Sequence, residues 1–191
     1  VQNGYIVACV DGRGTGYRGE EFKKCTYRNL GGKETEDQIS AARYIGSLPF
    51  VDASRIGIYG WSFGGFMALN CILKGADVFK MAIAVAPVTS WRYYDTIYTE
   101  VYNGLPQDNA AGYDDNSPIN FADRLQGKLL LIHGSADDNV HVQNSMEMAS
   151  ALIRAGKQFD MMIYPDDNHS MVPSGVHNIR EKMVEYTLKN L

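Results

Sequence analysis

The sequence predicts an α/β fold in which a mostly parallel β-sheet is flanked by helices. Its strand-like segments are short, continuous and apolar, which is typical of parallel strands buried on both faces. Segments with helical periodicity alternate with them, as parallel strand connections require. With 191 residues, of which 45% are hydrophobic, the chain is long enough for one domain with a sizeable core.

The N-terminal half contains two expected strands and two expected helices. A helix is expected over residues 34–48, where Ile39, Ala42, Tyr44 and Ile45 form its inner face. The other elements are an apolar strand over 5–10, a glycine-rich and charged loop over 12–32, a short strand over 55–59 and an apolar helix over 65–73.

The C-terminal half continues the alternation with three strands and three helices. The strands are expected over residues 81–86, 128–133 and 159–164, and Pro87 and Pro165 end the first and the last of them. Helices are expected over 90–101, 140–155 and 178–191, with a polar loop from the first of them to residue 116. Gly156 is the expected C-terminal cap of the middle helix.

The composition excludes several classes of function. The formal net charge is -4 and no run of Lys or Arg occurs, which argues against a nucleic-acid-binding surface. No apolar stretch reaches the roughly 18 residues of a membrane span, and no signal-peptide pattern is present. The spacing of Cys9, Cys25 and Cys71 does not match a zinc site, and we expect no metal.

Residues 14–19 match the pattern G-x-G-x-x-G and follow the first expected strand, which raises the question of a dinucleotide cofactor. The residues that follow do not read as an apolar helix, and no strand ending in an acidic residue comes about 20 positions later. We therefore interpret these glycines as a turn beside the site, and we expect no cofactor.

Residues 60–64, Gly-Trp-Ser-Phe-Gly, carry the strongest functional signal. They match G-x-S-x-G between an expected strand and an expected helix, which is the context of a nucleophile elbow. The tight turn needs small neighbours and pushes the Ser62 side chain out of the sheet. The N-terminal amides of the following helix point toward a developing oxyanion. The pattern predicts that Ser62 is a nucleophile for acyl transfer.

A serine nucleophile needs a base that an acid holds in the correct tautomer, and ligands of parallel sheets bind at the carboxyl ends of the strands. His169 lies in the loop after the last strand and is the expected base. His133 ends a strand and is interpreted as a packed core residue. His141 and His177 lie next to helices and are interpreted as surface or cap residues.

The acid is expected between the nucleophile and the base, in the order Ser–Asp–His of α/β-hydrolases. Asp137, Asp138, Asp166 and Asp167 all lie in loops after strands, and spacing alone leaves the choice among them open. One member of the pair at 137–138 is expected to be the N-cap of the next helix.

Trp91, Tyr94 and Tyr98 fall at positions i, i+3 and i+7 of the helix expected over residues 90–101. Packing into the core is the ordinary reason for such a stripe. Its place after the strand that follows the nucleophile favours a wall of the site. Flat aromatic rings suit a compact apolar ring such as proline, and phenolic hydroxyls can bind polar substrate atoms.

Several longer segments together identify a family. They are residues 11–17 (Asp-Gly-Arg-Gly-Thr-Gly-Tyr), 60–65, 85–88, 91–95, 98–100, 104–106 and 133–141 (His-Gly-Ser-Ala-Asp-Asp-Asn-Val-His). On these segments nearly the whole chain resembles the catalytic domain of the prolyl oligopeptidase family of serine peptidases, in its dipeptidyl peptidase IV branch. The resemblance implies an α/β-hydrolase fold and release of N-terminal dipeptides after a penultimate proline or, less well, alanine.

The resemblance also assigns roles to individual residues. Ser62 would be the nucleophile, Asp137 the acid, His169 the base, and the backbone amide of Phe63 one oxyanion donor. Asn139 would bind a substrate carbonyl. The pocket for the proline or alanine side chain would be lined by Phe63, Val88, Trp91, Tyr94, Tyr98 and Val140. The family often has tyrosine where this chain has Phe63, so a contribution from that hydroxyl would be lost while the amide is kept.

The same resemblance implies that residues 1–191 form a partial α/β-hydrolase domain, from the fourth strand to the C-terminal helix. The first strands, a second oxyanion donor and an N-terminal β-propeller with amine-binding glutamates would lie before residue 1. The third strand normally lies between the strands expected over 5–10 and 55–59, so we expect a gap in mid-sheet. This chain alone is expected to be a poor peptidase, because loss of one oxyanion donor costs about 100- to 1,000-fold in turnover.

Three other functions stay open on sequence grounds. An acylaminoacyl peptidase or a carboxylesterase uses the same elbow and triad, and a non-catalytic interaction domain shares the fold. The resemblance further implies a peptide substrate and a homodimer of the full-length protein. Relatives occur in the periplasm, in secreted form, at cell surfaces and in the cytosol.

Overall fold

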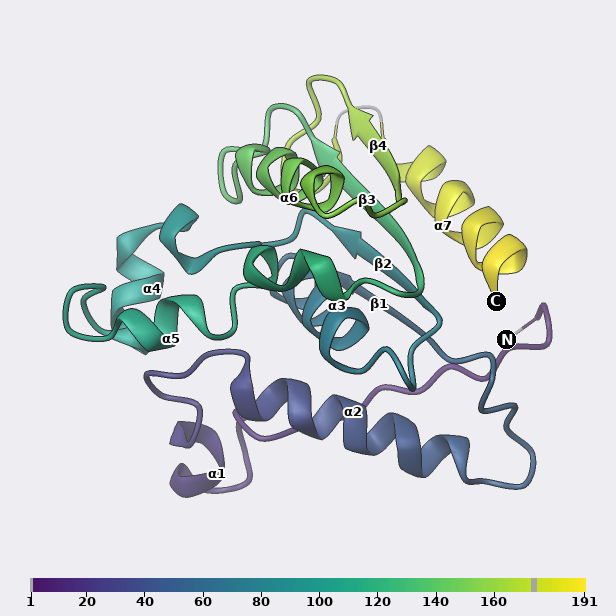
Figure 1. The fold of residues 1–191 in the computed structure, drawn as a ribbon, viewed down its shortest axis with the longest axis horizontal. Coiled ribbons are helices and arrows are strands. Elements are labelled where there is room, and N and C mark those ends of the chain that lie inside the picture. Colours follow the sequence, from purple (N-terminus) through teal and green to yellow (C-terminus); the bar gives the residue numbers. More distant parts are fainter. Residues whose placement is uncertain (1, 173–174) are drawn as a thin grey trace.

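The computed structural model of the protein describes residues 2–172 and 175–191. Its sheet has four parallel strands: β1 (Gly57–Trp61), β2 (Met81–Val85), β3 (Lys128–Gly134) and β4 (Asp160–Tyr164). They lie in the order β1-β2-β3-β4, so each strand pairs with its neighbour in the sequence (Figure 1). Trp61 pairs with Val85 and Val85 with Ile132, so the carboxyl ends of these strands meet at one edge of the sheet.

Helices cover both faces of the sheet. α3 (Phe63–Lys74) and α6 (Gln143–Arg154) pack on one face, and α7 (Val176–Asn190) packs on the other. α2 (Gly32–Gly46) lies against α3 (Figure 1). The shorter elements are α1 (Glu20–Lys24), α4 (Thr96–Asn103), α5 (Ala110–Asp114) and two 3₁₀ segments, η1 (Trp91–Tyr93) and η2 (Pro118–Arg124).

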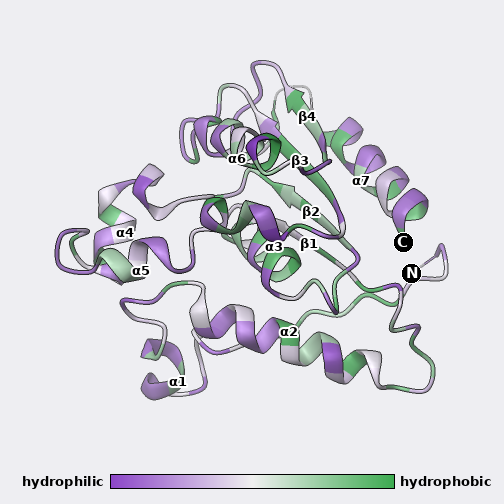
Figure 2. Cartoon of the chain, in the orientation of Figure 1, coloured by the Kyte–Doolittle hydropathy of each residue, from purple (hydrophilic) through white to green (hydrophobic). Residues whose placement is uncertain are grey.

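The residues of β2 show why the sheet is covered on both sides. Met81, Ile83 and Val85 belong to the core beneath α7, whereas Ala82 and Ala84 belong to the core beneath α3. All five are buried, as expected for a central parallel strand. Figure 2 shows the apolar strands at the centre and many polar residues on the surrounding helices.

The predicted α/β fold with parallel strands is confirmed. Four of the five expected strands are present, with bounds within two residues of the prediction. Within the described part of the chain, no helix is both long and apolar enough to cross a membrane.

Residues 5–10 do not form the predicted strand. They run without ladder pairing, and Ile6 and Val7 keep 59% and 75% of their surface exposed. A ladder needs a partner strand, and among the described residues none pairs with this segment. β1 is therefore an edge of the sheet. A cavity of about 670 Å³ is lined by this segment, β1 and α7.

The helix predicted over residues 90–101 is broken in two. η1 ends at Tyr93, and α4 begins at Thr96 after its N-cap, Asp95. The Asp95 carboxylate accepts a hydrogen bond from the backbone N–H of Tyr98 at 2.8 Å. Because such a cap starts a new helix, Trp91 does not share a helix with Tyr98. The polar loop expected up to residue 116 also contains α5, and the loop expected over 12–32 contains α1.

Candidate active site

Ser62 lies on a sharp turn between β1 and α3. Its backbone angles, φ 59° and ψ -117°, belong to neither helix nor strand, and such conformations cost about 1–3 kcal/mol to hold. The Ser62 amide donates to the carbonyl oxygen of Val85 at 2.8 Å, which fixes the turn to β2. Position 60 requires glycine, because a Cβ there would lie 2.0 Å from the carbonyl oxygen of Gly64. The turn thus holds Ser62 at the carboxyl edge of the sheet.

Phe63 is the first residue of α3 and follows Ser62 directly. The first amides of a helix have no intrahelical partner and carry the positive end of the helix dipole. The Phe63 N–H therefore suits an anion that forms next to Ser62. Its assignment as an oxyanion donor stays a prediction.

Asp137 and His169 are in direct contact. His169 Nδ1 lies 2.7 Å from Asp137 Oδ2, and the Asp137 side chain is fully buried while that of His169 is 21% exposed. Asp137 follows β3 and His169 follows β4, so two neighbouring loops bring them together. A carboxylate at Nδ1 requires Nδ1–H, which leaves Nε2 of the neutral ring free to accept a proton.

The Asp137 carboxylate is held as an anion. Its Oδ1 accepts hydrogen bonds from the backbone N–H groups of Asn139 at 3.0 Å and Val140 at 2.9 Å. Burial raises the pKa of Asp137, but hydrogen bonds from His133 and His169 outweigh burial and hold this pKa well below its usual range. Asp137 is therefore negatively charged at neutral pH, as an acid that orients a histidine must be.

Among the described residues, no hydrogen bond like that of Asp137 joins His169 to another candidate acid. Asp138 and Asp166 are exposed, and Asp167 is buried. The helix N-cap predicted for the pair at 137–138 is wrong. α6 begins later, at Gln143, and its N-cap position makes no side-chain hydrogen bond. The Asp137 side chain caps the turn before this helix instead.

The other three histidines have the burial that the sequence predicts. His133 is fully buried at the end of β3, whereas His141 and His177 are exposed. His133 is not isolated from the site, because its Nε2 lies 3.2 Å from Asp137 Oδ2.

A hydrogen bond joins the serine turn to the loop after β4. The indole Nε1–H of Trp61 donates to the backbone carbonyl of His169 at 2.9 Å. Since Trp61 precedes Ser62, this bond ties the loop of His169 to the turn of Ser62. Among the described residues, no hydrogen bond joins Ser62 Oγ to His169. In enzymes without substrate such bonds are often long, and they tighten in the complex.

Three aromatic side chains of the predicted pocket cluster around the fourth, Trp91. The ring centroids of Phe63, Tyr94 and Tyr98 lie 6.1, 6.2 and 5.9 Å from that of Trp91. Tyr98 stacks on Trp91, and Tyr94 meets Tyr98 edge to face. Trp91 is buried, whereas the other three are partly exposed. The break between η1 and α4 therefore does not prevent the predicted aromatic wall.

Asn139 connects this aromatic cluster to the loop of Asp137. The Tyr94 hydroxyl donates to Asn139 Oδ1 at 2.7 Å, which leaves the amide nitrogen of Asn139 to donate to a ligand. Burial raises the pKa of Tyr98 to about 12, so its hydroxyl stays protonated at neutral pH. Val88 and Val140 are buried in the same core. The structure thus brings the predicted pocket residues together, while their binding roles stay predictions.

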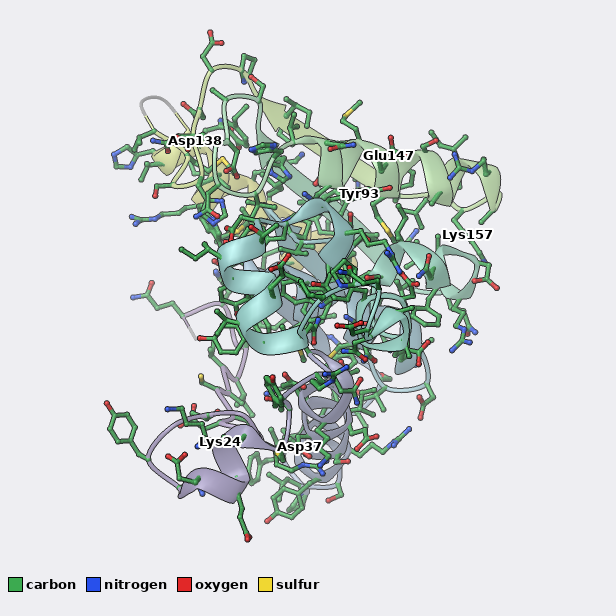
Figure 3. The ribbon with its side chains drawn as sticks, turned by 90° about the vertical axis from the view of Figure 1, so that its left-hand side faces the viewer. Lys24, Asp37, Tyr93, Asp138, Glu147 and Lys157 are labelled. Carbon is green, nitrogen blue, oxygen red and sulfur yellow. The ribbon has the colours of Figure 1, made fainter. Side chains whose placement is uncertain are left out.

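A cavity of about 700 Å³ is lined by Phe63, Tyr98 and residues of α1, α2 and the loop between them. In Figure 3, the segments that carry Lys24 and Asp37 lie at the bottom of the view, at the opposite end from Asp138. Glu34 of α2 also lines the cavity. Burial raises the pKa of Glu34, whose carboxylate accepts a hydrogen bond from the backbone N–H of Gly31 at 3.1 Å.

A sequence model of the prolyl oligopeptidase family matches residues 1–191. The chain belongs to this family. The resemblance carried by residues 11–17, 60–65 and 133–141 is thereby confirmed.

Relatives within the family carry the names of dipeptidyl peptidases. The chain is 48% identical over 171 residues to "Probable dipeptidyl-aminopeptidase B" of Arthroderma benhamiae and 47% identical over 175 residues to "Dipeptidyl peptidase 4" of Felis catus. These alignments cover 88% and 90% of this chain, and 19% and 23% of the relatives. The chain thus spans about a fifth of the length of these curated relatives.

The crystal structure of Porphyromonas gingivalis dipeptidyl peptidase 4 is similar in three dimensions. It matches 96% of this chain with a TM-score of 0.94 and 51% sequence identity, and the match covers 26% of that structure's chain. This likeness confirms that the fold is that of an α/β-hydrolase catalytic domain in the prolyl oligopeptidase family.

Two contacts of the site, Trp61 with His169 and His133 with Asp137, involve residues to which the sequence analysis gave no role in the site. Trp61 is only an unspecified position of G-x-S-x-G, and nothing in the sequence points to the carbonyl of His169. His133 precedes Asp137 by four residues. A strand end and the turn that follows it lie close in space, so this spacing is a usable signal for their contact.

Proposed function

We propose that residues 1–191 form the catalytic part of a serine peptidase that releases dipeptides from peptide N-termini after a penultimate proline or, less well, alanine. The observation that carries this proposal is the strained turn of Ser62 on the same sheet edge as the Asp137–His169 pair. Unrelated folds use the same constellation for acyl transfer. The dipeptidyl peptidase names of the relatives support the reaction class.

In the acylation step, Ser62 Oγ attacks the carbonyl carbon of the second substrate residue while His169 Nε2 takes the hydroxyl proton. The electron pair of the carbonyl bond moves to its oxygen, and the Phe63 N–H donates to this oxyanion. Asp137 stabilises the imidazolium that forms. The intermediate then expels the amine of the third residue, which takes the proton from His169. A dipeptidyl ester remains on Ser62.

In the deacylation step, water takes the place of the released amine. His169 Nε2 removes a proton from water as the oxygen attacks the ester carbon, and the Phe63 N–H again donates to the oxyanion. The bond to Ser62 Oγ breaks, and this oxygen regains a proton from His169. The dipeptide leaves with a free carboxyl group, and the enzyme returns to its starting state.

The aromatic cluster supports proline at the second substrate position. A pyrrolidine ring is compact and apolar, and it matches the partly exposed faces of Tyr94 and Tyr98 beside buried Trp91. The amide nitrogen of Asn139 is oriented to donate to a substrate carbonyl. Alanine buries less apolar surface against the same rings, and therefore binds more weakly.

We further propose that the full-length protein supplies a strand beside β1, together with the second oxyanion donor and a β-propeller whose glutamates bind the substrate amine. The relatives are several times longer than this chain. The outer edge of β1 has no partner strand within the described residues, and it shares a cavity with Cys9. A homodimer through the region of α7, where Val184 and Leu188 are half exposed, belongs to the same proposal.

Alkylation of the cysteines by iodoacetamide tests the added strand. In the full-length protein we expect Cys9 to be protected and the partly exposed Cys25 to react. Cys71 is an internal control that should stay unmodified, because burial raises the pKa of its thiol to about 12. Modification of Cys9 as extensive as that of Cys25, measured by peptide mass spectrometry, would reject the added strand.

Labelling with a fluorophosphonate tests whether the full-length protein is a serine hydrolase. The activated Ser62 oxygen displaces fluoride and forms a bond to phosphorus, so the wild type should be labelled and Ser62→Ala should not. Ser40→Ala, an exposed serine of α2, is the matched control and should be labelled like the wild type. A folded wild type that is not labelled would contradict the proposal that the protein is a serine hydrolase, and it would favour a non-catalytic interaction domain.

A reporter panel then separates the possible enzymes. We expect the highest kcat/KM for Xaa-Pro reporters with a free amine, lower values for Xaa-Ala, and little cleavage of acetyl-amino-acid reporters and simple esters. Preference for an acetylated reporter would identify an acylaminoacyl peptidase, and preference for an ester would identify a carboxylesterase. The isolated chain of 191 residues should cleave a Gly-Pro reporter at least about 100-fold more slowly than the full-length protein.

A further inference from the structure

His133 lies at the end of β3 with hydrogen-bonding partners at both ring nitrogens. Its Nδ1 is 2.7 Å from the hydroxyl oxygen of Ser145 on α6. Its Nε2 is 2.7 Å from the carbonyl oxygen of Val140 and 3.2 Å from Asp137 Oδ2. The side chains of His133 and Asp137 have no exposed surface, and Ser145 is buried as well. These contacts therefore form away from bulk water, where polar partners count for more.

The partners determine which nitrogen of His133 carries the proton. A backbone carbonyl and a carboxylate can only accept hydrogen bonds, so Nε2 must be protonated. In the neutral ring Nδ1 is then an acceptor, and the Ser145 hydroxyl donates to it. Ser145 thus favours the Nε2–H tautomer. This Nε2–H bonds to the carbonyl oxygen of Val140 and also faces Asp137 Oδ2.

The contact with His133 completes the surroundings of the Asp137 carboxylate. Oδ1 accepts two backbone N–H groups, from Asn139 and Val140. Oδ2 accepts from His169 on one side and faces the Nε2–H of His133 on the other. Donors at both oxygens restrain rotation of the carboxylate, so Oδ2 stays aimed at His169. An apolar residue of similar size would fill the space at position 133 without this restraint.

We propose that His133 is a positioning residue of the peptidase reaction, which donates to Asp137 and, with Ser145, holds this carboxylate as His169 requires. The inference rests on the proposed function and goes beyond it, because His133 neither touches the substrate nor transfers its proton. A donor on Oδ2 also withdraws negative charge from the carboxylate.

Substitution of His133 by glutamine or asparagine tests the contributions of its two ring nitrogens separately. The amide nitrogen of glutamine stands as many bonds from Cβ as Nε2 does, so His133→Gln can keep a donor at Asp137. The amide of asparagine reaches only to the position of Nδ1, so His133→Asn keeps a polar group near Ser145 and loses the donor at Asp137. Both variants place an amide in the same buried site, which makes them a matched pair.

The variants are compared in the full-length protein with a Xaa-Pro reporter. We expect His133→Gln to keep kcat within about threefold of the wild type, and His133→Asn to lower kcat about tenfold at unchanged KM. The rate of fluorophosphonate labelling per labelled molecule should fall in parallel, and this rate does not depend on the folded fraction.

The outcomes distinguish this inference from the proposed function. If His133→Asn gives no folded protein, His133→Leu replaces it, because an apolar side chain leaves no unpaired amide, and the same losses are expected. Equal kcat values and equal labelling rates for the donor-keeping and donor-lacking variants would show that His133 is only a packing residue. A folded wild type that neither cleaves the reporter nor labels at Ser62 would refute the proposed function itself, and this inference with it.

Discussion

The indole of Trp61 and the backbone carbonyl of His169 form a hydrogen bond of 2.9 Å, although the two residues are 108 positions apart in the sequence. Trp61 ends β1, and His169 lies in the loop after β4, which are the two outer strands of the described sheet. The bond therefore crosses the carboxyl edge of the sheet, above β2 and β3. It links the segment of Ser62 to the segment of His169.

Loss of this bond should impair positioning more than binding. Trp61→Phe keeps an aromatic ring and removes the N–H, so the His169 loop loses one restraint worth about 1 kcal/mol. We expect kcat with a Xaa-Pro reporter to fall about fivefold, with little change in KM. The control is Tyr44→Phe, which should leave both constants unchanged. The sequence predicts Tyr44 on the inner face of α2, but it is 69% exposed. An unaltered kcat in Trp61→Phe would show that the loop is held without this bond.

Substitution of Asn139 should reveal which end of its amide faces the substrate. Because Tyr94 donates to Oδ1, the nitrogen is the end available to a ligand. Asn139→Asp removes that nitrogen and adds a negative charge, so kcat/KM for Xaa-Pro reporters should fall about 100-fold. Asn139→Ala should cost about tenfold, as for one lost hydrogen bond. Wild-type kinetics of Asn139→Asp, measured at saturating and limiting substrate, would contradict a donor role.

Gly60→Ala should abolish the serine turn. The added Cβ would lie 2.0 Å from the carbonyl oxygen of Gly64 and 2.1 Å from its carbon, and backbone atoms cannot move aside cheaply. We expect at least a 100-fold loss of fluorophosphonate labelling, or no folded protein in gel filtration. Gly46→Ala at the end of α2 is the matched control, because its nearest neighbour is the flexible tip of Ile56 at 3.1 Å. Normal labelling of Gly60→Ala would show that the turn has more room than the distances allow.

The fold is predictable from the sequence wherever an apolar run has a partner strand. The segments around 57–61, 81–85, 128–134 and 160–164 all form strands, because each finds a parallel neighbour. The equally apolar run at 5–10 does not, since pairing is a property of two segments and no pattern within one segment reports it. The break at Asp95 is a similar case. Helical periodicity continues through it, but its side-chain cap starts a second helix.

The site is predictable in its chemistry and less so in its connections. Ser62 and His169 follow from motif and topology, whereas the choice of Asp137 over its neighbours needs the family resemblance or the 2.7 Å contact. Spacing cannot select it, because adjacent aspartates differ only in the direction of their side chains. The bond from Trp61 to the carbonyl of His169 is set by tertiary packing and leaves no trace in the sequence. The contact of His133 with Asp137 is local, and only its four-residue spacing indicates it.

Glu34 should make the stability of this domain depend on pH. Burial raises the pKa of its carboxyl in the folded state above the value of about 4.3 expected for the unfolded chain. The folded state therefore holds this proton more tightly than the unfolded state does. The resulting stabilisation is fully present below about pH 4.3 and is lost as the pH rises through the raised pKa. Asp137, whose pKa is lowered, acts in the opposite sense and in a more acidic range.

Glu34→Gln should remove this loss of folded-state stability at higher pH. Glutamine stays neutral, and its oxygen can still accept the hydrogen bond from Gly31 N–H. We expect the variant to match the wild type near pH 4 and to have a Tm about 2 °C higher at pH 7. The Tm is measured at each pH in the full-length protein by differential scanning calorimetry, which does not depend on the reactivity of Ser62. Glu36→Gln, whose side chain is 70% exposed on the same helix, is the control and should show no comparable gain. A Tm difference that is the same at both pH values would mean that Glu34 does not titrate between them, and that its effect comes from packing alone.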